Sequence, residues 1–335
     1  MSKIAIMGSG GWGTAIAVMT SKFGNQISLW SVFPEEIDTI IKDKENKKLL
    51  RGIAIPKNIN LTSDINCASD ADVVVLAVPS FATRSTAKLL QPILKENTIV
   101  VNIAKGLEEN SSKRLSQVLQ EELPLCKIVV MSGPSHAEEV ALGLPTTNVV
   151  SSKNIETAQV VQDVFMNPTF RIYTSLDIIG AELGGALKNI IALAAGIIDG
   201  MGFGDNTKAA LMTRGITEMV RLGVALGAKA ETFAGLTGFG DLIVTCTSIH
   251  SRNRRCGILI GKGYNVEDAL KEIGMTVEGY RTTKAAYKLA LDLGIEMPIV
   301  NETYKVLYEN KLPKDAILDL MTRMKKHETE DLWIK

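Results

Sequence analysis

The pattern of apolar and polar positions divides this chain into two parts. As far as about residue 175, short apolar runs alternate with amphipathic stretches. Runs such as 73–78 are apolar at every position, which is typical of parallel strands covered on both faces. The pattern predicts strands at 3–7, 26–30, 72–78, 98–103, 127–131, 146–150 and 170–174. Between them it predicts helices at 12–23, 34–44, 82–91, 111–122, 134–142 and 154–166. This alternation favours an α/β domain with a doubly wound parallel sheet.

Strand patterns stop near residue 176, and long helical patterns follow. They predict helices at 178–198, 206–227, 253–262, 266–273, 279–293, 298–309 and 313–325. A chain of 335 residues is also too long for one compact core. We therefore predict an α/β domain at 1–177, an all-α domain at 178–328 and a short tail at 329–335.

A glycine-rich segment at residues 8–15 follows the first predicted strand. Gly8, Gly10 and Gly13 have the spacing G-x-G-x-x-G. Between a strand and a helix, this spacing is the dinucleotide-binding fingerprint. The glycines allow a tight turn, close approach of the pyrophosphate and close packing of the helix. The helix that begins near Trp12 would direct its N–H groups at the phosphates. Domain 1–177 is therefore predicted to be of the Rossmann type, and an ordinary βα turn is the alternative interpretation.

Charge and cysteine content exclude several function classes. Lys plus Arg and Asp plus Glu both number 37, so nothing attracts nucleic acid or membrane in general. No cysteine lies in a CxxC or has zinc-ligand spacing with a histidine, which predicts reduced thiols and no metal site: Cys67, Cys126, Cys246 and Cys256. No signal-peptide pattern precedes the glycine loop, so we expect a cytoplasmic protein.

Polar motifs follow three of the predicted strands. They are Pro79-Ser80, Lys105-Gly106 and the segment 133–136, Gly-Pro-Ser-His. Ligands of open α/β sheets bind beyond the carboxyl ends of the strands, where these motifs fall. Lys105 is the most informative, because an ammonium group there could hold a phosphate or orient a hydroxyl. A solvated loop lysine is the alternative.

Lys188 and Asn189 interrupt the apolar run 179–198, and with Glu182 they favour a buried helix over a membrane span. Gly184 and Gly185 precede Lys188 by one helical turn and lie on its face. Because glycine is costly inside a helix, the pair predicts close approach of a nicotinamide or substrate. Burial would lower the pKa of Lys188 and suit it to general acid–base catalysis. Helix packing on glycine, with Lys188 directed outward, is the alternative.

Further candidates lie between the later helices. Asp241 precedes an apolar helix and could cap it, orient Lys188 or accept a substrate hydroxyl. Thr245 lies one turn later on the same face. Ser251 would cap the next helix, and with the three arginines of segment 252–255 it predicts a compact phosphate site. A solvated charged face is the alternative interpretation of these arginines.

These motifs together resemble the soluble bacterial NAD(P)-dependent glycerol-3-phosphate dehydrogenases. The resemblance extends from Ile4 to about Met324, and its markers are segments 8–14, 105–108, 132–135, 184–189, 238–241, 251–255 and 277–281. It implies interconversion of sn-glycerol 3-phosphate and dihydroxyacetone phosphate, mainly as reduction for glycerophospholipid synthesis. It also implies a homodimer and a helical domain like the C-terminal domain of 6-phosphogluconate dehydrogenase.

The resemblance assigns roles to individual residues. Lys188 would donate and accept the proton, with Lys105, Asn189 and Asp241 beside it. Substrate contacts are implied for Lys105, Gly133, Ser135, Lys188, Asp241, Thr245, Ser251, Arg252 and Asn253. Cofactor contacts are implied for Gly8, Gly10, Gly11, Trp12, Gly13, Val32, Lys105, Ala137, Arg252, Val277 and Glu278.

Other interpretations stay open from the residues alone. A dehydrogenase for another β-hydroxyacid or phosphosugar would share the glycine loop, although it would not need Lys105 and the Ser251 site. A dinucleotide-sensing regulator would not need Lys188, Asp241 and Arg252 together. The preference between NAD and NADP is also open, because Ser31-Val32-Phe33 offers neither an acid for the ribose nor an arginine for a 2′-phosphate.

Overall fold

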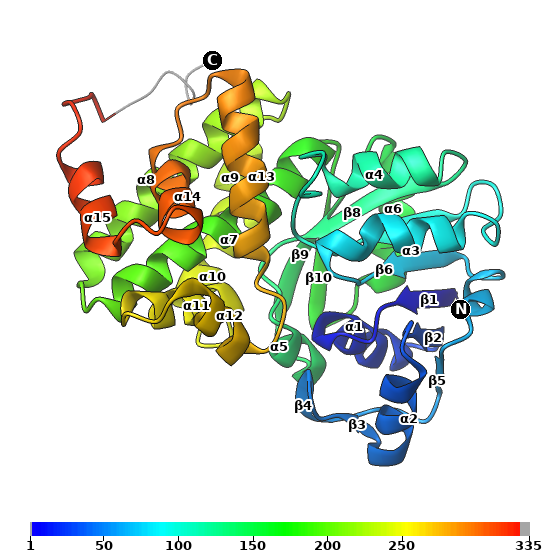
Figure 1. Ribbon diagram of the computed structural model, residues 1–335. Helices are drawn as coiled ribbons and strands as arrows, with labels where there is room; N and C mark the ends of the chain where they lie inside the picture. Colours follow the sequence, from blue (N-terminus) through cyan, green and yellow to red (C-terminus); the bar gives the residue numbers. More distant parts are fainter. Residues whose placement is uncertain (1, 329–335) are drawn as a thin grey trace. The chain divides into compact units, whose positions relative to one another are not determined.

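The computed structural model describes residues 2–328, which form two compact units (Figure 1). One unit holds the residues up to Ala104 together with Leu115–Ile178. The other holds Lys105–Arg114 and the residues from Ile179 onward. The predicted tail at 329–335 lies outside the described residues.

The first unit is built on one eight-stranded sheet with the strand order β10-β9-β8-β7-β6-β1-β2-β5. Its strands are β1 (Lys3–Met7), β2 (Gln26–Trp30), β5 (Ile59–Thr62), β6 (Val73–Leu76), β7 (Ile99–Asn102), β8 (Lys127–Ser132), β9 (Thr146–Ser152) and β10 (Phe170–Ser175). Its helices are α1 (Gly11–Ser21), α2 (Pro34–Asp43), α3 (Thr83–Leu90), α4 (Leu115–Glu122), α5 (Ala137–Leu142) and α6 (Ile155–Phe165). The first crossover of the strand order lies at β1, where a doubly wound sheet binds its ligand.

Successive side chains of a strand point to opposite faces of this sheet, so they pack into two separate cores, one on each face. Val73 and Val75 join the core beneath α1, α5 and α6, whereas Val74 and Leu76 join the core beneath α3 and α4 (Figure 1). Helices therefore cover both faces, and the predicted doubly wound α/β class is confirmed.

One strand pairing departs from the predicted parallel sheet. β8 pairs antiparallel with β9, from Val129–Ser152 to Ser132–Val149. The connecting helix α5 has only six residues. At about 1.5 Å per residue it spans about 9 Å, too short to carry the chain back along the sheet. The chain therefore re-enters the sheet from the edge at which β8 ends.

The sequence patterns also missed three short strands, β3 (Glu45–Asn46), β4 (Leu50–Ala54) and β5. β3 and β4 form a small antiparallel ribbon of their own. β3 has only two residues, and in β4 the adjacent Arg51 and Gly52 interrupt the period-two pattern on which strand prediction depends.

The second unit is helical. Its helices are α7 (Ile178–Gly200), α8 (Asp205–Ala225), α9 (Ala230–Ala234), α10 (Asp241–Thr247), α11 (Arg252–Gly261), α12 (Val266–Ile273), α13 (Glu278–Leu293), α14 (Pro298–Tyr308) and α15 (Pro313–Met321). By length and composition α7 could cross a membrane, yet 94% of its most apolar window is buried in protein. It is a core helix, as predicted.

The continuous domain predicted at 1–177 is wrong for residues 105–114, which belong to the helical unit. Leu107 is buried in the core of that unit. Arg114 forms an ion pair with Glu182 on α7 at 2.5 Å, and Glu109 accepts a hydrogen bond from Arg281 on α13 at 2.9 Å. These contacts tie Lys105 to the helices, and the predicted helix 111–122 consequently begins only at Leu115.

Candidate active site

The glycine loop of the first unit is held in a tight turn against β6. Gly8 has φ +126°, and a Cβ there would lie 2.8 Å from the carbonyl carbon of Ala77. A Cβ on Gly13 would lie 2.1 Å from the carbonyl oxygen of Gly8. Any side chain at these two positions would therefore push the helix away from the strand.

Gly10 differs, because a Cβ there would meet only the Ala77 carbonyl oxygen at 3.9 Å. Gly10 is the N-cap of α1, and no side chain caps this helix. The first-turn amides of a helix have no intrahelical acceptor and attract anions. The open space and the uncapped amides fit the pyrophosphate of a dinucleotide.

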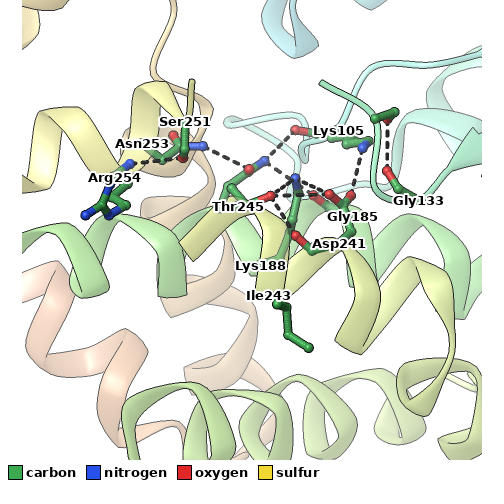
Figure 2. Close-up of polar contacts among 12 residues, drawn as sticks. Lys105, Gly133, Gly185, Lys188, Asp241, Ile243, Thr245, Ser251, Asn253 and Arg254 are labelled. Atoms are coloured by element: carbon green, nitrogen blue, oxygen red, sulfur yellow. Dashed lines mark hydrogen bonds and ion pairs between the residues drawn. The ribbon is translucent and has the colours of Figure 1, made fainter. Parts of the chain in front are cut away.

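In the helical unit, two lysines converge on one buried carboxylate. Lys188 Nζ donates to Asp241 Oδ1 at 2.7 Å and to Thr245 Oγ1 at 2.6 Å, and Lys105 Nζ donates to Asp241 Oδ2 at 2.7 Å (Figure 2). Asp241 is 1% exposed and Lys188 6% exposed. We call Lys105, Lys188, Asp241 and Thr245 the lysine cluster. The alternative in which Lys188 points outward is wrong.

Burial sets the charge properties of this cluster. Desolvation lowers the pKa of Lys188 to about 8, opposed by the charge of Asp241 and reinforced by that of Lys105. Burial alone would raise the pKa of Asp241, yet the nearby charges of Lys105 and Lys188 hold it below its usual value. The cluster thus contains an anionic carboxylate and an amine able to change protonation near neutral pH.

A chain of amides fixes the position of Lys105. Asn189 Nδ2 donates to the Lys105 carbonyl oxygen at 3.2 Å, and Asn253 Nδ2 donates to Asn189 Oδ1 at 2.9 Å. The Gly279 N–H donates to Asn253 Oδ1 at 2.8 Å. Asn189, which the sequence grouped with the catalytic residues, therefore contacts the backbone of Lys105, and Asn253 joins α7, α11 and α13.

Gly184 has a packing role, which is the part of the alternative interpretation that the structure supports. A Cβ there would lie 2.4 Å from the carbonyl oxygen of Thr237, so backbone rather than a ligand fills this side of α7. Thr237 belongs to the π-helical turn Leu236–Gly240, which ends at Asp241. The expectation that a nicotinamide or substrate occupies the space at Gly184 is wrong, because this glycine lets the turn that carries Asp241 approach α7.

Replacing Gly184 with alanine should therefore lower the free energy of unfolding by about 1–3 kcal/mol, the usual range for overpacking. Thermal unfolding measures the change. Gly204→Ala is the control for added volume, because a Cβ there meets nothing within 4 Å. It replaces the N-cap of α8, so it should lower the unfolding temperature by less than the overpacking at Gly184 does. Equal unfolding temperatures for the two variants would contradict the packing argument.

Glycines also bring α11 close to α7. A Cβ on Gly196 would lie 2.0 Å from the Arg254 carbonyl oxygen, and one on Gly257 would lie 2.1 Å from the Leu193 carbonyl oxygen. At the start of α11, the Ser251 hydroxyl accepts from the Arg254 N–H at 3.2 Å, which confirms the predicted cap. The Arg254 side chain is bound to Asp199 at 2.7 Å.

The remaining predicted site residues occupy varied environments. Arg252, Glu278 and Thr245 lie on helices of the second unit, whereas the Val277 side chain is buried in its core.

In the first unit, Ala137 begins α5, and its Cβ would lie 3.9 Å from a Cβ on Gly11. Gly133 has φ +142° and accepts a hydrogen bond from the Ser135 hydroxyl at 2.9 Å. Trp12 is partly buried on α1, and Val32 is 54% exposed after β2.

Sequence reasoning missed the side chains that brace the glycine loop. Asn46 Nδ2 donates to the Ser9 carbonyl oxygen at 2.7 Å and to Thr14 Oγ1 at 3.1 Å. Glu36 accepts from the Ser9 hydroxyl at 3.0 Å. The only sequence feature that pointed to Glu36 was its place in the first turn of a predicted helix. Asn46 lies in a strand that no sequence pattern predicted.

A dinucleotide loop on a doubly wound sheet, and a buried lysine on a helical unit, are features of two-domain nicotinamide-dependent dehydrogenases. Residues 3–158 match the N-terminal region of NAD-dependent glycerol-3-phosphate dehydrogenase, and residues 177–318 match its C-terminal region. The chain belongs to the NAD-dependent glycerol-3-phosphate dehydrogenase family, a family of oxidoreductases that use NAD(P).

The sequences of similar proteins match this chain over nearly its full length. A protein of Moorella thermoacetica, described as an NAD(P)+ glycerol-3-phosphate dehydrogenase, is 58% identical over 328 residues, covering 98% of both chains. A protein of Desulfitobacterium hafniense with the same description is 54% identical, covering 99% of this chain and 94% of its own. The crystal structure of glycerol-3-phosphate dehydrogenase from Coxiella burnetii is 36% identical with a TM-score of 0.93, covering 96% of this chain and 99% of that chain.

Proposed function

We propose that this chain catalyses the reversible NAD(P)-dependent oxidation of sn-glycerol 3-phosphate to dihydroxyacetone phosphate, with Lys188 as general acid and base. The observation that carries the proposal is the lysine cluster. Lys188 is buried, its pKa is lowered to about 8, and Asp241 and Thr245 fix its Nζ. The names of the similar proteins support the choice of substrate.

Lys188 moves one proton in each direction. In oxidation its neutral amine takes the proton of the C2 hydroxyl, and in reduction its ammonium form returns a proton to the carbonyl oxygen. The nicotinamide, when bound, accepts or supplies the hydride at C2. Asp241 keeps both lysines oriented, and Lys105 brings a second positive charge to the oxygen that becomes charged during the reaction.

The phosphate of the substrate requires a cationic and N–H-rich site. Ser251 and Arg252 begin α11, whose dipole and first-turn amides favour an anion. We assign substrate contacts to these residues and to Asn253, Gly133 and Ser135. Anchoring the phosphate holds C2 in a fixed position, which contributes a large part of the rate in such reactions.

Cofactor contacts are proposed at the glycine loop and at the residues that the family resemblance implies. They are Gly8, Gly10, Gly11, Trp12, Gly13, Val32, Lys105, Ala137, Arg252, Val277 and Glu278. Because the side chain of Val277 is packed in a core, its contact would be through the backbone. From family membership we also infer a cytoplasmic homodimer that works mainly in the direction of reduction, for glycerophospholipid synthesis.

The pH dependence follows from Lys188. Oxidation starts from the neutral amine, so kcat/KM for glycerol 3-phosphate should rise with pH and level off above about 8. Reduction starts from the ammonium form, so kcat/KM for dihydroxyacetone phosphate should fall above about 8. Initial rates measured in both directions across the neutral and alkaline range test this. Profiles that are flat there would contradict the assignment of Lys188.

The function itself is tested with purified protein, dihydroxyacetone phosphate, and NADH or NADPH. We expect loss of nicotinamide absorbance with at least one of the two cofactors. Dihydroxyacetone without its phosphate should react far more slowly, because α11 would have no anion to hold. No absorbance loss with either cofactor would overturn the proposed function.

A further inference from the structure

A carboxylate lies beside the glycine loop in a position that the sequence did not reveal. Glu36, in the first turn of α2, accepts hydrogen bonds at Oε2 from the hydroxyls of Ser9 at 3.0 Å and Ser31 at 2.8 Å. Ser9 belongs to the glycine loop, and Ser31 directly follows β2. The Gly8 N–H donates to the Trp30 carbonyl at 2.9 Å, which joins the loop to the end of β2. Glu36 therefore lies where the loop meets the carboxyl end of β2.

This is the part of a Rossmann domain that receives the adenosine ribose. An acidic residue about 20 positions beyond the glycine loop binds the ribose 2′-hydroxyl in enzymes that use NAD, whereas a nearby arginine accommodates the 2′-phosphate of NADP. Ser31, Val32 and Phe33 are neutral, so the sequence leaves the preference open. Glu36, in the first turn of α2, supplies a carboxylate at the end of β2, where Ser31, Val32 and Phe33 supply none.

We propose that Glu36 makes this chain select NAD over NADP, by accepting the ribose 2′-hydroxyl and repelling a 2′-phosphate. The proposal rests on the function proposed above and concerns the cofactor of that reaction. Within residues 2–328 both hydrogen bonds to the Glu36 side chain end on Oε2, which leaves Oε1 to accept another. The serines also fix the carboxylate, because the Ser31 hydroxyl in turn accepts from the Phe33 N–H at 3.3 Å.

The surrounding charges support selection against a 2′-phosphate. No lysine or arginine occurs between Ser31 and Glu36, and Val32 and Phe33 offer only apolar surface, 54% and 53% exposed. The nearest cation along the chain is Lys42, which is exposed in the last turn of α2. Lys47 is bound to Asp43 at 3.2 Å, and Lys48 is exposed. A dianionic 2′-phosphate beside Glu36 would meet a fixed negative charge without a matching cation from this segment.

Binding of the cofactors to the purified full chain, measured by isothermal titration calorimetry, tests the proposal without turnover. The wild type should bind NADH at least about tenfold more tightly than NADPH, the scale of a hydrogen bond to a charged group. Glu36→Gln should bring the two affinities within about threefold, mainly by strengthening NADPH binding. Glu36→Asp keeps the charge and should keep most of the discrimination. Glu35→Gln is the matched control: it removes the same charge from the same helical turn, at a side chain that is exposed, and should keep the wild-type ratio.

Each outcome decides a separate claim. Equal affinities in the wild type, or tighter binding of NADPH, overturn the role of Glu36, as does an unchanged ratio in Glu36→Gln. A change of the ratio in Glu35→Gln as large as in Glu36→Gln would show that helix charge alone is responsible, and would also overturn it. A protein that prefers NADH in this titration but does not reduce dihydroxyacetone phosphate would refute the proposed function and leave the selection by Glu36 intact. Thermal unfolding of each variant establishes that the loop remains folded.

Discussion

Replacing Lys188 with alanine should lower turnover by about 10³-fold or more, within the range that general acid–base catalysis contributes, while dinucleotide affinity stays at the wild-type level. The reason is that Lys188 Nζ is the group proposed to carry the proton, whereas the glycine loop belongs to the other unit. Steady-state rates in both directions and calorimetric titration with NADH separate the two effects.

The fold should tolerate this substitution, because Asp241 keeps its second ion pair with Lys105 at 2.7 Å. Lys208→Ala is the matched control. It also removes a lysine that is bound to an aspartate, Asp199 at 2.6 Å, but it lies outside the lysine cluster. The control should retain turnover. Lys188→Ala with turnover close to the wild type would refute the assignment of the proton carrier.

The second large effect is expected for Asp241→Asn, which keeps the volume and removes the charge. Both ammonium groups then lose their carboxylate, and breaking a buried ion pair typically costs about 3–5 kcal/mol. Because Asp241 raises the pKa of Lys188, its loss should move the inflection of the pH–rate profile below about 8. We expect kcat/KM to fall by at least about 10²-fold as the lysines lose their orientation.

Asp199→Asn provides the comparison for this variant. Asp199 also joins two cations, Lys208 at 2.6 Å and Arg254 at 2.7 Å. Its replacement should lower the unfolding temperature but leave the pH inflection where it is in the wild type. An inflection that does not move in Asp241→Asn would show that Asp241 does not control the protonation of Lys188.

Much of the fold could be predicted because its signals are local. Apolar runs such as 73–76 and 99–102 predicted buried strands, and G-x-G-x-x-G predicted the turn at Gly8. The exceptions depended on contacts between distant residues. No local pattern shows that β9 turns antiparallel to β8, or that residues 105–114 pack with the helices.

The candidate site shows the same difference between local sequence signals and contacts of distant residues. Lys188, Asp241 and Thr245 could be named from residue type and helical spacing, since an ionisable group in an apolar helix requires a partner. Asp241 could also be named as a partner of Lys188, whereas its second partner, Lys105, could not. Lys105 and Asp241 are 136 positions apart in the chain, and only the packing of the 105–114 segment makes them an ion pair. For Gly184 the sequence correctly predicted that another group approaches closely. The favoured interpretation expected a ligand there, but the neighbour is the backbone of Thr237.

The sequence by itself determined a dinucleotide-binding α/β domain, a helical domain and a lysine suited to proton transfer. These follow from spacing and side-chain chemistry within a few turns or strands of the chain. The tertiary structure decided which charges meet. It placed two lysines on Asp241 and returned Glu36 to the end of β2. Electrostatic interactions depend on distance and burial, which the order of residues along a chain does not specify.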